Sequence, residues 1–325
     1  MAKYPDWIYR QSAVLPYRRG ASGLKVLLIT SRKGKRWILP KGIVEPGMTA
    51  GTSAAKEALE EAGIKGEIWE RSLASYADKK WGGTCAVEVF PMQVSVELAD
   101  WPEAAIRRRE WLTVDEAAAR IDKVGLRNVV LGLPKAMTTH DDKGRHYVAD
   151  TIVPPRVLYL FRHAKSSWDE PGLEDFARPL APRGERAGEA MRNYMKVADV
   201  RPRLVLCSSA VRTRQTLDAV LPAFDRDVDV AYENGLYHGG ASDLTKRLRH
   251  VPDEVTSIML VGHNPTLQAL AESLVDGGDA EAMARLQDKF PTGALATLVY
   301  RQDHWRDVEP GACELHSFVV PRELG

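Results

Sequence analysis

The sequence predicts a chain of two domains, an α+β domain followed by an α/β domain. The first observation is length, because 325 residues exceed the roughly 150 that one domain usually needs. The second is a polar stretch at 138–155, which ends in two prolines and suits a linker. The third is that elements follow in a different order on its two sides, at 1–137 and at 156–325.

The front domain is expected to hold strands and two helices. Its strands are predicted at 25–30, 37–39 and 84–96. A helix rich in Ala, Glu and Leu is predicted over 49–62, with Gly63 as its end. A second helix is predicted over 114–121, because Thr113 and Glu116 have the spacing of a capping box. This order predicts a mixed sheet between helices.

The rear domain alternates apolar runs with helical stretches. Three runs fit strands that are buried on both faces of a mostly parallel sheet, at 157–161, 204–206 and 258–261. The helices are predicted at 184–197, 212–221, 242–249 and 266–274. This alternation predicts an α/β domain whose sheet is flanked by helices.

Composition narrows the class of protein. Lys plus Arg (45) nearly balances Asp plus Glu (44), so no nucleic-acid or membrane-surface partner is expected. No apolar run approaches the ~20 residues that span a bilayer, and the first residues carry no signal-peptide pattern. Cys85, Cys207 and Cys313 are far apart, which excludes a disulfide scaffold and a CxxC metal site. We therefore expect a cytoplasmic location.

Three glutamates share one face of the first predicted helix. Glu57, Glu60 and Glu61 lie at i, i+3 and i+4. Carboxylates this close repel one another unless a cation neutralises them, and Mg²⁺ or Mn²⁺ prefers oxygen ligands. A solvated acidic helix face is the alternative interpretation, and it is the more common one for such a triplet alone.

The surrounding residues resemble the Nudix box, Gly-x5-Glu-x7-Arg-Glu-U-x-Glu-Glu-x-Gly-U, in which U is aliphatic. The matching positions are Gly42, Glu57, Glu60, Glu61, Gly63 and Ile64. Met48 and Lys56 replace the Glu and the Arg that pair in this family. We therefore expect a Met–Lys contact in place of that ion pair.

The Nudix resemblance implies Mg²⁺- or Mn²⁺-dependent hydrolysis of a nucleoside diphosphate linked to another moiety. Glu57, Glu60 and Glu61 would hold the metal, and Glu60, Glu61 or a metal hydroxide would activate water. Lys41 would neutralise a phosphate, with an ordinary exposed lysine as the alternative.

Two further segments of the front domain resemble the diphosphoinositol and diadenosine polyphosphate branch of the Nudix family. They are Trp101-Pro102-Glu103 and the basic run Arg107-Arg108-Arg109. Three adjacent arginines would raise the capture of densely anionic substrates. A solvated turn is the alternative.

Three cation-bearing turns follow the predicted strands of the rear domain. Arg162 and His163 follow the first strand, Arg212 follows the second, and His263 follows the third. Ligands in an open α/β sheet lie at the carboxyl ends of its strands. Arginine binds phosphate oxygens with two donors, and a neutral imidazole can attack phosphorus. The four side chains therefore predict a phosphoryl site.

Together with the stretch Asp175–Leu180, these turns resemble the histidine phosphatase superfamily and its SixA branch, which removes phosphate from phosphohistidine. The resemblance implies that His163 is the nucleophile and becomes phosphohistidine. The phosphate would be held by Arg162, Arg212 and His263. Glu233 stands in the place of the proton donor, with a surface glutamate as the alternative and Asp243 as a fallback. No cofactor is implied for this domain.

The order of the two domains resembles MutT-type proteins. It implies a bifunctional phosphohydrolase that cleaves nucleoside polyphosphates, such as oxidised nucleoside triphosphates or dinucleoside polyphosphates, and removes a phosphate through phosphohistidine. The alternative is a signalling protein that dephosphorylates a phosphohistidine protein. Its front domain would then sense or hydrolyse a polyphosphorylated ligand such as a diphosphoinositol polyphosphate. Residues 1–23 and 303–325 carry no motif and are assigned no role.

Overall fold

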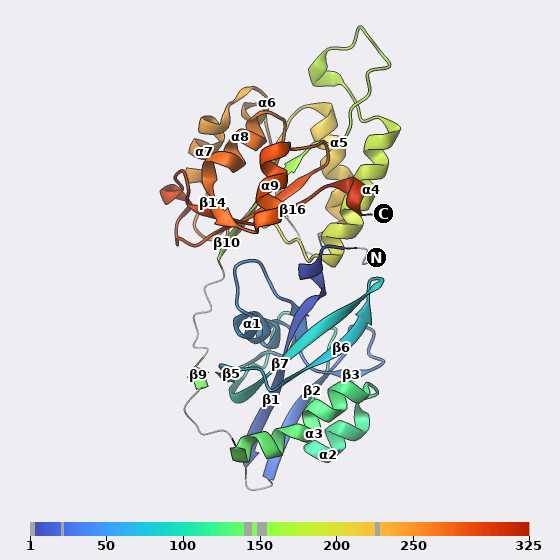
Figure 1. Cartoon of the computed structure of the whole chain (residues 1–325), viewed down its shortest axis with the longest axis vertical. Helices are drawn as coiled ribbons and strands as arrows, with labels where there is room; N and C mark the ends of the chain where they lie inside the picture. The colour runs from blue at the N-terminus through green and yellow to red at the C-terminus, as the bar shows by residue number, and fades with distance from the viewer. Residues whose placement is uncertain (1–3, 21–22, 140–144, 148–154, 225–227, 325) are drawn as a thin grey trace. The chain divides into compact units, whose positions relative to one another are not determined.

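The computed structural model of the chain describes residues 4–20, 23–139, 145–147, 155–224 and 228–324. Contacts between residues divide the chain into two compact units, Met1–Val153 and Pro154–Gly325 (Figure 1). Within the described ranges no helix is long and apolar enough to cross a membrane.

A mixed sheet forms the centre of the N-terminal unit. Its described strands are β1 (Arg10–Gly20), β2 (Gly23–Thr30), β3 (Trp37–Ile38), β4 (Lys41–Ile43), β5 (Ile64–Trp69), β6 (Ala74–Lys80), β7 (Gly83–Glu97), β8 (Arg109–Thr113) and β9 (Arg145–Tyr147). Six of them follow the order β3-β2-β1-β7-β5-β9, while β4, β6 and β8 pair with β1, β7 and β2. β1 and β7 run parallel, and the other pairs run antiparallel. The predicted mixed sheet is therefore confirmed.

The helices of this unit begin and end at identifiable caps. The helices are α1 (Ala50–Ala62), α2 (Val114–Arg120) and α3 (Val124–Thr139). The hydroxyl of Thr49 accepts from the Thr52 N–H at the start of α1, and Gly63 ends it in the left-handed conformation at φ 62°. The predicted capping box of Thr113 and Glu116 opens α2. α3, which lies beside α2 in Figure 1, was not predicted because Pro134 interrupts its pattern.

The segment 1–23, to which no role was assigned, contains β1. Among the described strands of this sheet, β1 has the longest run of buried residues. β1 is buried from Gln11 to Tyr17 and pairs with β2, β4 and β7. Pro16 and the arginines at its end hide its strand pattern. Against this sheet α1 packs its small side chains, with Ala54 and Ala58 fully buried. Because the alanines of α1 face the sheet, its glutamates lie on an adjacent face of the same helix.

The predicted linker at 138–155 lies in part outside the described residues. Its first residues, Thr138 and Thr139, complete α3, and Arg145–Tyr147 form β9 against β5. The contact division falls inside the same range, between Val153 and Pro154. The exact domain boundaries remain a prediction.

The C-terminal unit is built on a mostly parallel sheet, as predicted. Its described strands are β10 (Arg156–Arg162), β11 (Leu204–Ser208), β12 (Asp229–Glu233), β13 (Ser257–Gly262), β14 (Val275–Gly278), β15 (Leu295–Tyr300) and β16 (Cys313–Val319). They follow the order β12-β11-β13-β10-β15-β16-β14. The first four run parallel, and β15 runs antiparallel to both of its neighbours. β16 occupies the second segment that was assigned no role, at 303–325.

Helices flank this sheet in two visible groups, with α4 beside α5 and α7 beside α8 (Figure 1). The helices are α4 (Pro182–Val197), α5 (Val211–Val220), α6 (Gly235–His238), α7 (Ala241–Arg249), α8 (Thr266–Leu274) and α9 (Ala280–Asp288). The registers align Arg162 with Gly262 and Cys207 with Val261. The carboxyl ends of β10, β11 and β13 therefore meet at one edge of the sheet.

Candidate active sites

Glu57 is placed by a close approach to the β4 backbone. It is 8% exposed and lies one turn before Glu61, which is also 8% exposed. A Cβ atom added at Gly42 would come within 1.9 Å of Glu57 Oε1. Only glycine leaves room for this carboxylate, which explains the first glycine of the motif.

Glu61 is held at both of its carboxylate oxygens. Oε2 accepts from the backbone N–H of Lys41 at 2.9 Å, and Oε1 pairs with the Arg107 guanidinium. Burial raises the pKa of Glu61, while Arg107 opposes that shift. The structure therefore fixes the orientation of Glu61 on the side of α1 that faces β4.

Lys56 keeps an ion pair, so the expected Met–Lys contact is a wrong prediction. Its Nζ pairs with Glu45, three residues before Met48, and lies 3.4 Å from Glu60 Oε1. Burial works against the charge, but Glu45 and Glu60 outweigh it and raise the pKa of Lys56. The acidic partner of Lys56 stands at position 45 instead of position 48, so an ion pair still joins the loop to α1.

Lys41 differs from the exposed lysine of the alternative interpretation. Its side chain is 10% exposed, and its Nζ donates to Gln11 Oε1 at 3.2 Å and lies 3.9 Å from Asp78 Oδ2. Burial and the neighbouring Lys80 lower the pKa of Lys41 to about 8. Lys41 therefore contacts Glu61 through its backbone N–H, while its ammonium group lies beside Gln11 and Asp78.

The expected patch of three arginines does not exist as a surface patch. Arg107 is buried and binds Glu61, Glu103 and the Thr30 carbonyl. Arg109 donates to the carbonyls of Ala62 and Leu98 and stacks on Trp101, with 4.1 Å from its Cζ atom to the ring centroid. Of the three, only Arg108 is exposed. Two arginines turn inward because the end of α1 presents unpaired carbonyls and a buried carboxylate.

The donor set of α1 fits a hard divalent ion. Glu57, Glu60 and Glu61 supply carboxylate oxygens from one face of one helix, as predicted, and the missing side chain at Gly42 keeps space beside them. In this structure Lys56 lies 3.4 Å from Glu60 and Arg107 pairs with Glu61, so both carboxylates have a cationic neighbour. Among the described residues the oxygens of the three glutamates do not all lie within 4.8 Å of one another.

In the C-terminal unit the sheet edge brings the four predicted residues together. The backbone N–H of His163 donates to the Gly262 carbonyl at 3.0 Å, which ties the end of β10 to the end of β13. The rings of His163 and His263 lie 5.1 Å apart. His163 Nδ1 donates to the Ala164 carbonyl at 2.7 Å, since a carbonyl only accepts. The lone pair of His163 is therefore on Nε2, which has no hydrogen-bond partner among the described residues.

Both histidines are neutral near pH 7. Burial lowers the pKa of His163 to about 4, and Arg212 and Arg162 contribute to the shift. Burial and the neighbouring His163 lower the pKa of His263 to about 3. A neutral imidazole at His163 is the form that can attack phosphorus.

The two arginines bring positive charge to the same place. Arg212 Nη2 donates to His263 Nδ1 at 3.3 Å, and His263 Nε2 donates to the Ser208 hydroxyl at 2.8 Å. Burial and the neighbouring Arg212 lower the pKa of Arg162. The Nε of Arg162 is buried without a hydrogen-bond partner among the described residues. An unsatisfied buried donor beside three other basic groups fits an anionic ligand.

Glu233 is bound elsewhere in its own unit. The Arg247 guanidinium donates from Nε to both oxygens of Glu233 at 3.0 Å, and from Nη2 to Oε1 at 2.8 Å. The fallback residue, Asp243, accepts from the Gly240 N–H at the start of α7. Neither carboxylate shows a contact to His163, so the role of Glu233 as proton donor remains a prediction.

Asp175 is a candidate site residue that the sequence analysis missed. Its Oδ2 lies 2.8 Å from Arg212 Nη2 and accepts from the Tyr237 hydroxyl at 2.9 Å. The signal was present, since Asp175 opens the stretch Asp175–Leu180 that carried the SixA resemblance. A carboxylate inside such a stretch was a candidate for contact with the site's arginines.

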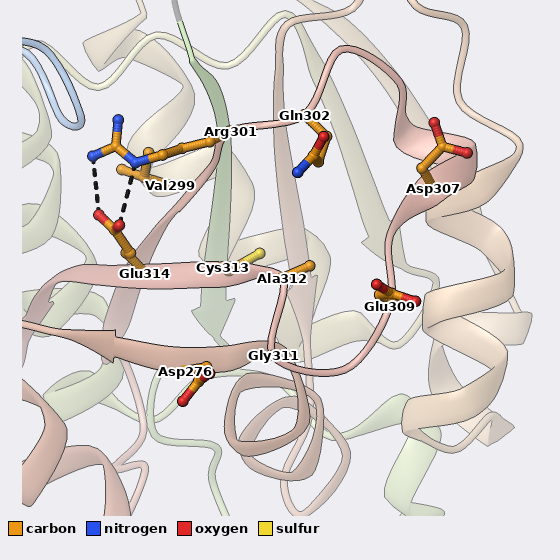
Figure 2. A pocket seen from close by; sticks show the side chains of 10 residues that line it. All are labelled: Asp276, Val299, Arg301, Gln302, Asp307, Glu309, Gly311, Ala312, Cys313 and Glu314. Carbon is orange, nitrogen blue, oxygen red and sulfur yellow. Dashed lines mark hydrogen bonds and ion pairs between the residues drawn. The ribbon is translucent and has the colours of Figure 1, made fainter.

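A separate pocket of about 580 Å³ lies at the other end of the sheet (Figure 2). Its wall includes Val299, which pairs with Val157 near the start of β10, whereas His163 follows the end of β10. Its acidic lining residues are Asp276, Asp307, Glu309 and Glu314. Figure 2 shows Arg301 turned toward Glu314, with Nη2 3.0 Å from Oε2. Its position near the start of β10 separates the pocket from the candidate site, and its mostly acidic charged residues do not suit an anionic ligand.

Comparison with known proteins gives a match for each unit. The model of the NUDIX domain matches residues 9–131, and that of the histidine phosphatase superfamily (branch 1) matches residues 158–238. An uncharacterized protein of Mycobacterium tuberculosis is 41% identical over 167 residues, which are 50% of this chain and 99% of that protein. Nudix hydrolase 12, a mitochondrial protein of Arabidopsis thaliana, is 40% identical over 102 residues, which are 29% of this chain and 50% of that protein.

A solved structure matches with a similar share of the chain. It is provisionally named the phosphohistidine phosphatase SixA of Agrobacterium tumefaciens and is 34% identical, with a TM-score of 0.44. The match covers 52% of this chain and 99% of that one. By the two family models, the chain contains a NUDIX domain followed by a domain of the histidine phosphatase superfamily (branch 1), and both domains indicate a hydrolytic enzyme.

Proposed function

We propose that the chain is a bifunctional phosphohydrolase. The N-terminal unit hydrolyses nucleoside polyphosphates with Mg²⁺ or Mn²⁺, and the C-terminal unit removes a phosphate through a phosphohistidine on His163. The observation that carries the proposal is the convergence of His163, Arg162, Arg212 and His263, with a lone pair at His163 Nε2. The buried free thiols of the chain support a cytoplasmic location.

In the phosphatase step, His163 Nε2 attacks phosphorus and the bond to the leaving group breaks. The Ala164 carbonyl keeps the proton on His163 Nδ1 and stabilises the positive ring that forms. Arg162 and Arg212 donate to the phosphoryl oxygens as charge spreads over them. Water then attacks the phosphoryl group and loses a proton to the solvent. The electron pair of the N–P bond returns to His163 Nε2, which leaves the imidazole neutral and the phosphate free.

In the Nudix step, Glu57, Glu60 and Glu61 would hold the divalent ion. When bound, the ion would polarise the phosphates and lower the pKa of a water molecule. Gly42 leaves room for Glu57, while the Lys41 N–H and Arg107 keep Glu61 in one orientation. Lys41 would attract the substrate's negative charge from a buried position.

A second candidate function is the dephosphorylation of a phosphohistidine protein, with a front domain that binds or cleaves a polyphosphorylated ligand such as a diphosphoinositol polyphosphate. The pairing of Glu233 with Arg247 favours it. A phosphorylated alcohol needs a proton donor, because its leaving oxygen would otherwise depart as a strongly basic alkoxide. The imidazole of phosphohistidine is a far weaker base than an alkoxide, so it can leave without a proton donor. A site whose candidate acid is held by an arginine suits the second kind of leaving group.

The test of the phosphatase site is to trap the phosphoenzyme. The full chain is mixed with phosphoimidazole in the presence of chelator and quenched in alkali, where phosphohistidine survives. We expect a phosphoryl group bound to His163 in the unchanged protein and no bound phosphoryl group in His163→Ala. A phosphoenzyme that persists in His163→Ala would contradict the proposal.

The test of the Nudix site uses a panel of nucleoside and dinucleoside polyphosphates. We expect Mg²⁺-dependent release of a nucleotide that is lost with chelator and in Glu60→Gln and Glu61→Gln. Normal turnover in either variant would exclude that residue from the metal site. The His163→Ala variant serves as the control, because its N-terminal unit is unchanged.

A further inference from the structure

A carboxylate lies on the solvent side of the phosphatase site. Asp175 begins a short 3-10 turn, Asp175–Ala177. Its side chain is 54% exposed, whereas the side chain of Arg212, which it contacts at 2.8 Å, is 8% exposed. The backbone carbonyl of Asp175 accepts from the same guanidinium. Asp175 therefore lies between solvent and the arginine that is placed to hold the phosphoryl group.

The position of Asp175 is held by aromatic and basic neighbours. The Tyr237 hydroxyl donates to Oδ2 at 2.9 Å, and Arg178 Nε lies 3.8 Å from Oδ1. The Tyr237 ring packs edge-on against His263 and Phe176, with centroids 5.3 and 5.1 Å apart. These contacts keep the carboxylate directed toward the site even though it is half exposed.

Asp175 carries a negative charge at neutral pH. Partial burial opposes the charge, but the hydrogen bonds from Tyr237 and Arg212 outweigh it and lower the pKa of Asp175. A leaving group that departs past Arg212 therefore passes a fixed anion. An anionic leaving group would be repelled by Asp175, whereas a leaving group with an N–H would donate a hydrogen bond to it.

We propose that Asp175 is the specificity-determining residue of the phosphatase site, which favours a leaving group that carries an N–H over an anionic one. The proposal rests on the proposed transfer of phosphate to His163. For a phosphorylated imidazole, the ring carries a proton on the nitrogen that does not hold phosphorus, and that N–H donates to Asp175. His163 Nε2 forms the new N–P bond, the old N–P bond breaks, and its electron pair leaves neutral imidazole. No proton donor is required.

The experiment compares two substrates on the full chain in the presence of chelator, so that the N-terminal unit is silent. The substrates are phosphoimidazole, which loses a neutral ring, and inorganic pyrophosphate, which loses an anion. For Asp175→Asn we expect kcat/KM to fall about tenfold or more with phosphoimidazole, as for the loss of a hydrogen bond to a charged group, and to hold or rise with pyrophosphate. The ratio of the two values does not depend on how much of the variant is folded.

Two controls accompany this comparison. Asp169→Asn removes an exposed carboxylate of the same loop, which bonds only Ser167 among the described residues, and is expected to leave the ratio unchanged. Asp175→Glu keeps the charge and is expected to retain the preference for phosphoimidazole. An Asp175→Asn ratio equal to that of the unchanged protein would overturn the inference while leaving the nucleophile intact. Activity that survives in His163→Ala would instead overturn the proposed phosphohistidine, and the inference with it.

Discussion

At the scale of single residues, the positions of carboxylates and imidazoles depend on what their neighbours leave open. Gly42 has no side chain, so the Glu57 carboxylate rests against the β4 backbone. His163 is bonded to a carbonyl at Nδ1, so its reactive lone pair is at Nε2. In both cases a neighbouring backbone group decides the geometry of a charged or nucleophilic side chain.

Gly42→Ala tests the first of these. The new Cβ would come within 1.9 Å of Glu57 Oε1, and the carboxylate has to move because it ends a flexible side chain. We expect Mn²⁺ affinity, measured by titration calorimetry, to fall roughly 10- to 100-fold with little change in melting temperature. Gly20→Ala is the matched control, since nothing lies within 4 Å of its added Cβ. Unchanged Mn²⁺ affinity would show that Glu57 does not bind the ion.

The pH dependence of the phosphatase reaction tests the second feature, the neutral His163 with its lone pair at Nε2. The pKa of His163 is lowered from 6.5 to about 4, so the neutral nucleophile persists well below neutral pH. We expect kcat/KM for phosphoimidazole, corrected for its own protonation, to show no enzyme inflection near 6.5 and to fall about tenfold per pH unit below about 4. An enzyme inflection near pH 6.5 would mean that His163 is exposed to solvent.

The lowered pKa of His163 also makes the stability of the fold depend on pH. Between pH 6.5 and about 4 the unfolded chain binds a proton at His163 and the folded chain does not, so the unfolded state binds more protons. We expect the free energy of unfolding to fall as pH is lowered through this window, and to fall less in His163→Ala. Urea unfolding at several pH values measures it. Identical pH profiles for the two proteins would contradict the shift.

At the scale of elements, the ends of α1 decide how the Nudix motif is presented. Thr49 and Gly63 begin and end the helix, and Arg109 bonds the carbonyl of Ala62 at its last turn. Arg107 and Arg109, which follow Trp101 in the sequence, therefore bond groups at the end of α1. A basic run in the sequence turned out to be part of the support for the carboxylates.

Arg109→Met tests this role. It removes the hydrogen bonds to Ala62 and Leu98 and the stacking on Trp101, so we expect a loss of about 2 kcal/mol in the free energy of unfolding. Arg108→Met changes its exposed neighbour and is expected to have almost no effect. Urea unfolding of both variants makes the comparison. If the two variants had the same free energy of unfolding, the bonds of Arg109 would contribute no more to stability than an exposed side chain does.

At the scale of the whole molecule, each compact unit contains its own candidate site. The acidic face of α1 belongs to the first unit, and the basic edge of β10, β11 and β13 belongs to the second. The opposite charge of the two sites assigns them opposite ligands, a divalent cation and a phosphate.

Hydrogen exchange with ligand present tests this division. Mg²⁺ is expected to slow exchange in α1 and β4 and not at the end of β10, because a bound ligand stabilises the part of the fold that holds it. Inorganic phosphate with chelator is expected to do the reverse, with protection around His163. Protection of the same segments by both ligands would show that the sites are not separate.

Local patterns in the sequence determined much of this fold. The caps of α1 and α2, the three parallel strand runs and the positions of His163 and His263 after them follow from spacing within a few residues. Such features depend on short-range hydrogen bonding and on hydrophobic periodicity, which a single chain displays directly.

Only the tertiary structure decided which charged groups meet. Arg107 reaches Glu61 across 46 positions, and Arg212 reaches Asp175 across 37. The same holds for β1, whose burial depends on strands that come later in the chain. Pairings of this kind depend on how distant segments pack, and a carboxylate or guanidinium looks the same in sequence whether it will face solvent, a metal ion or another side chain.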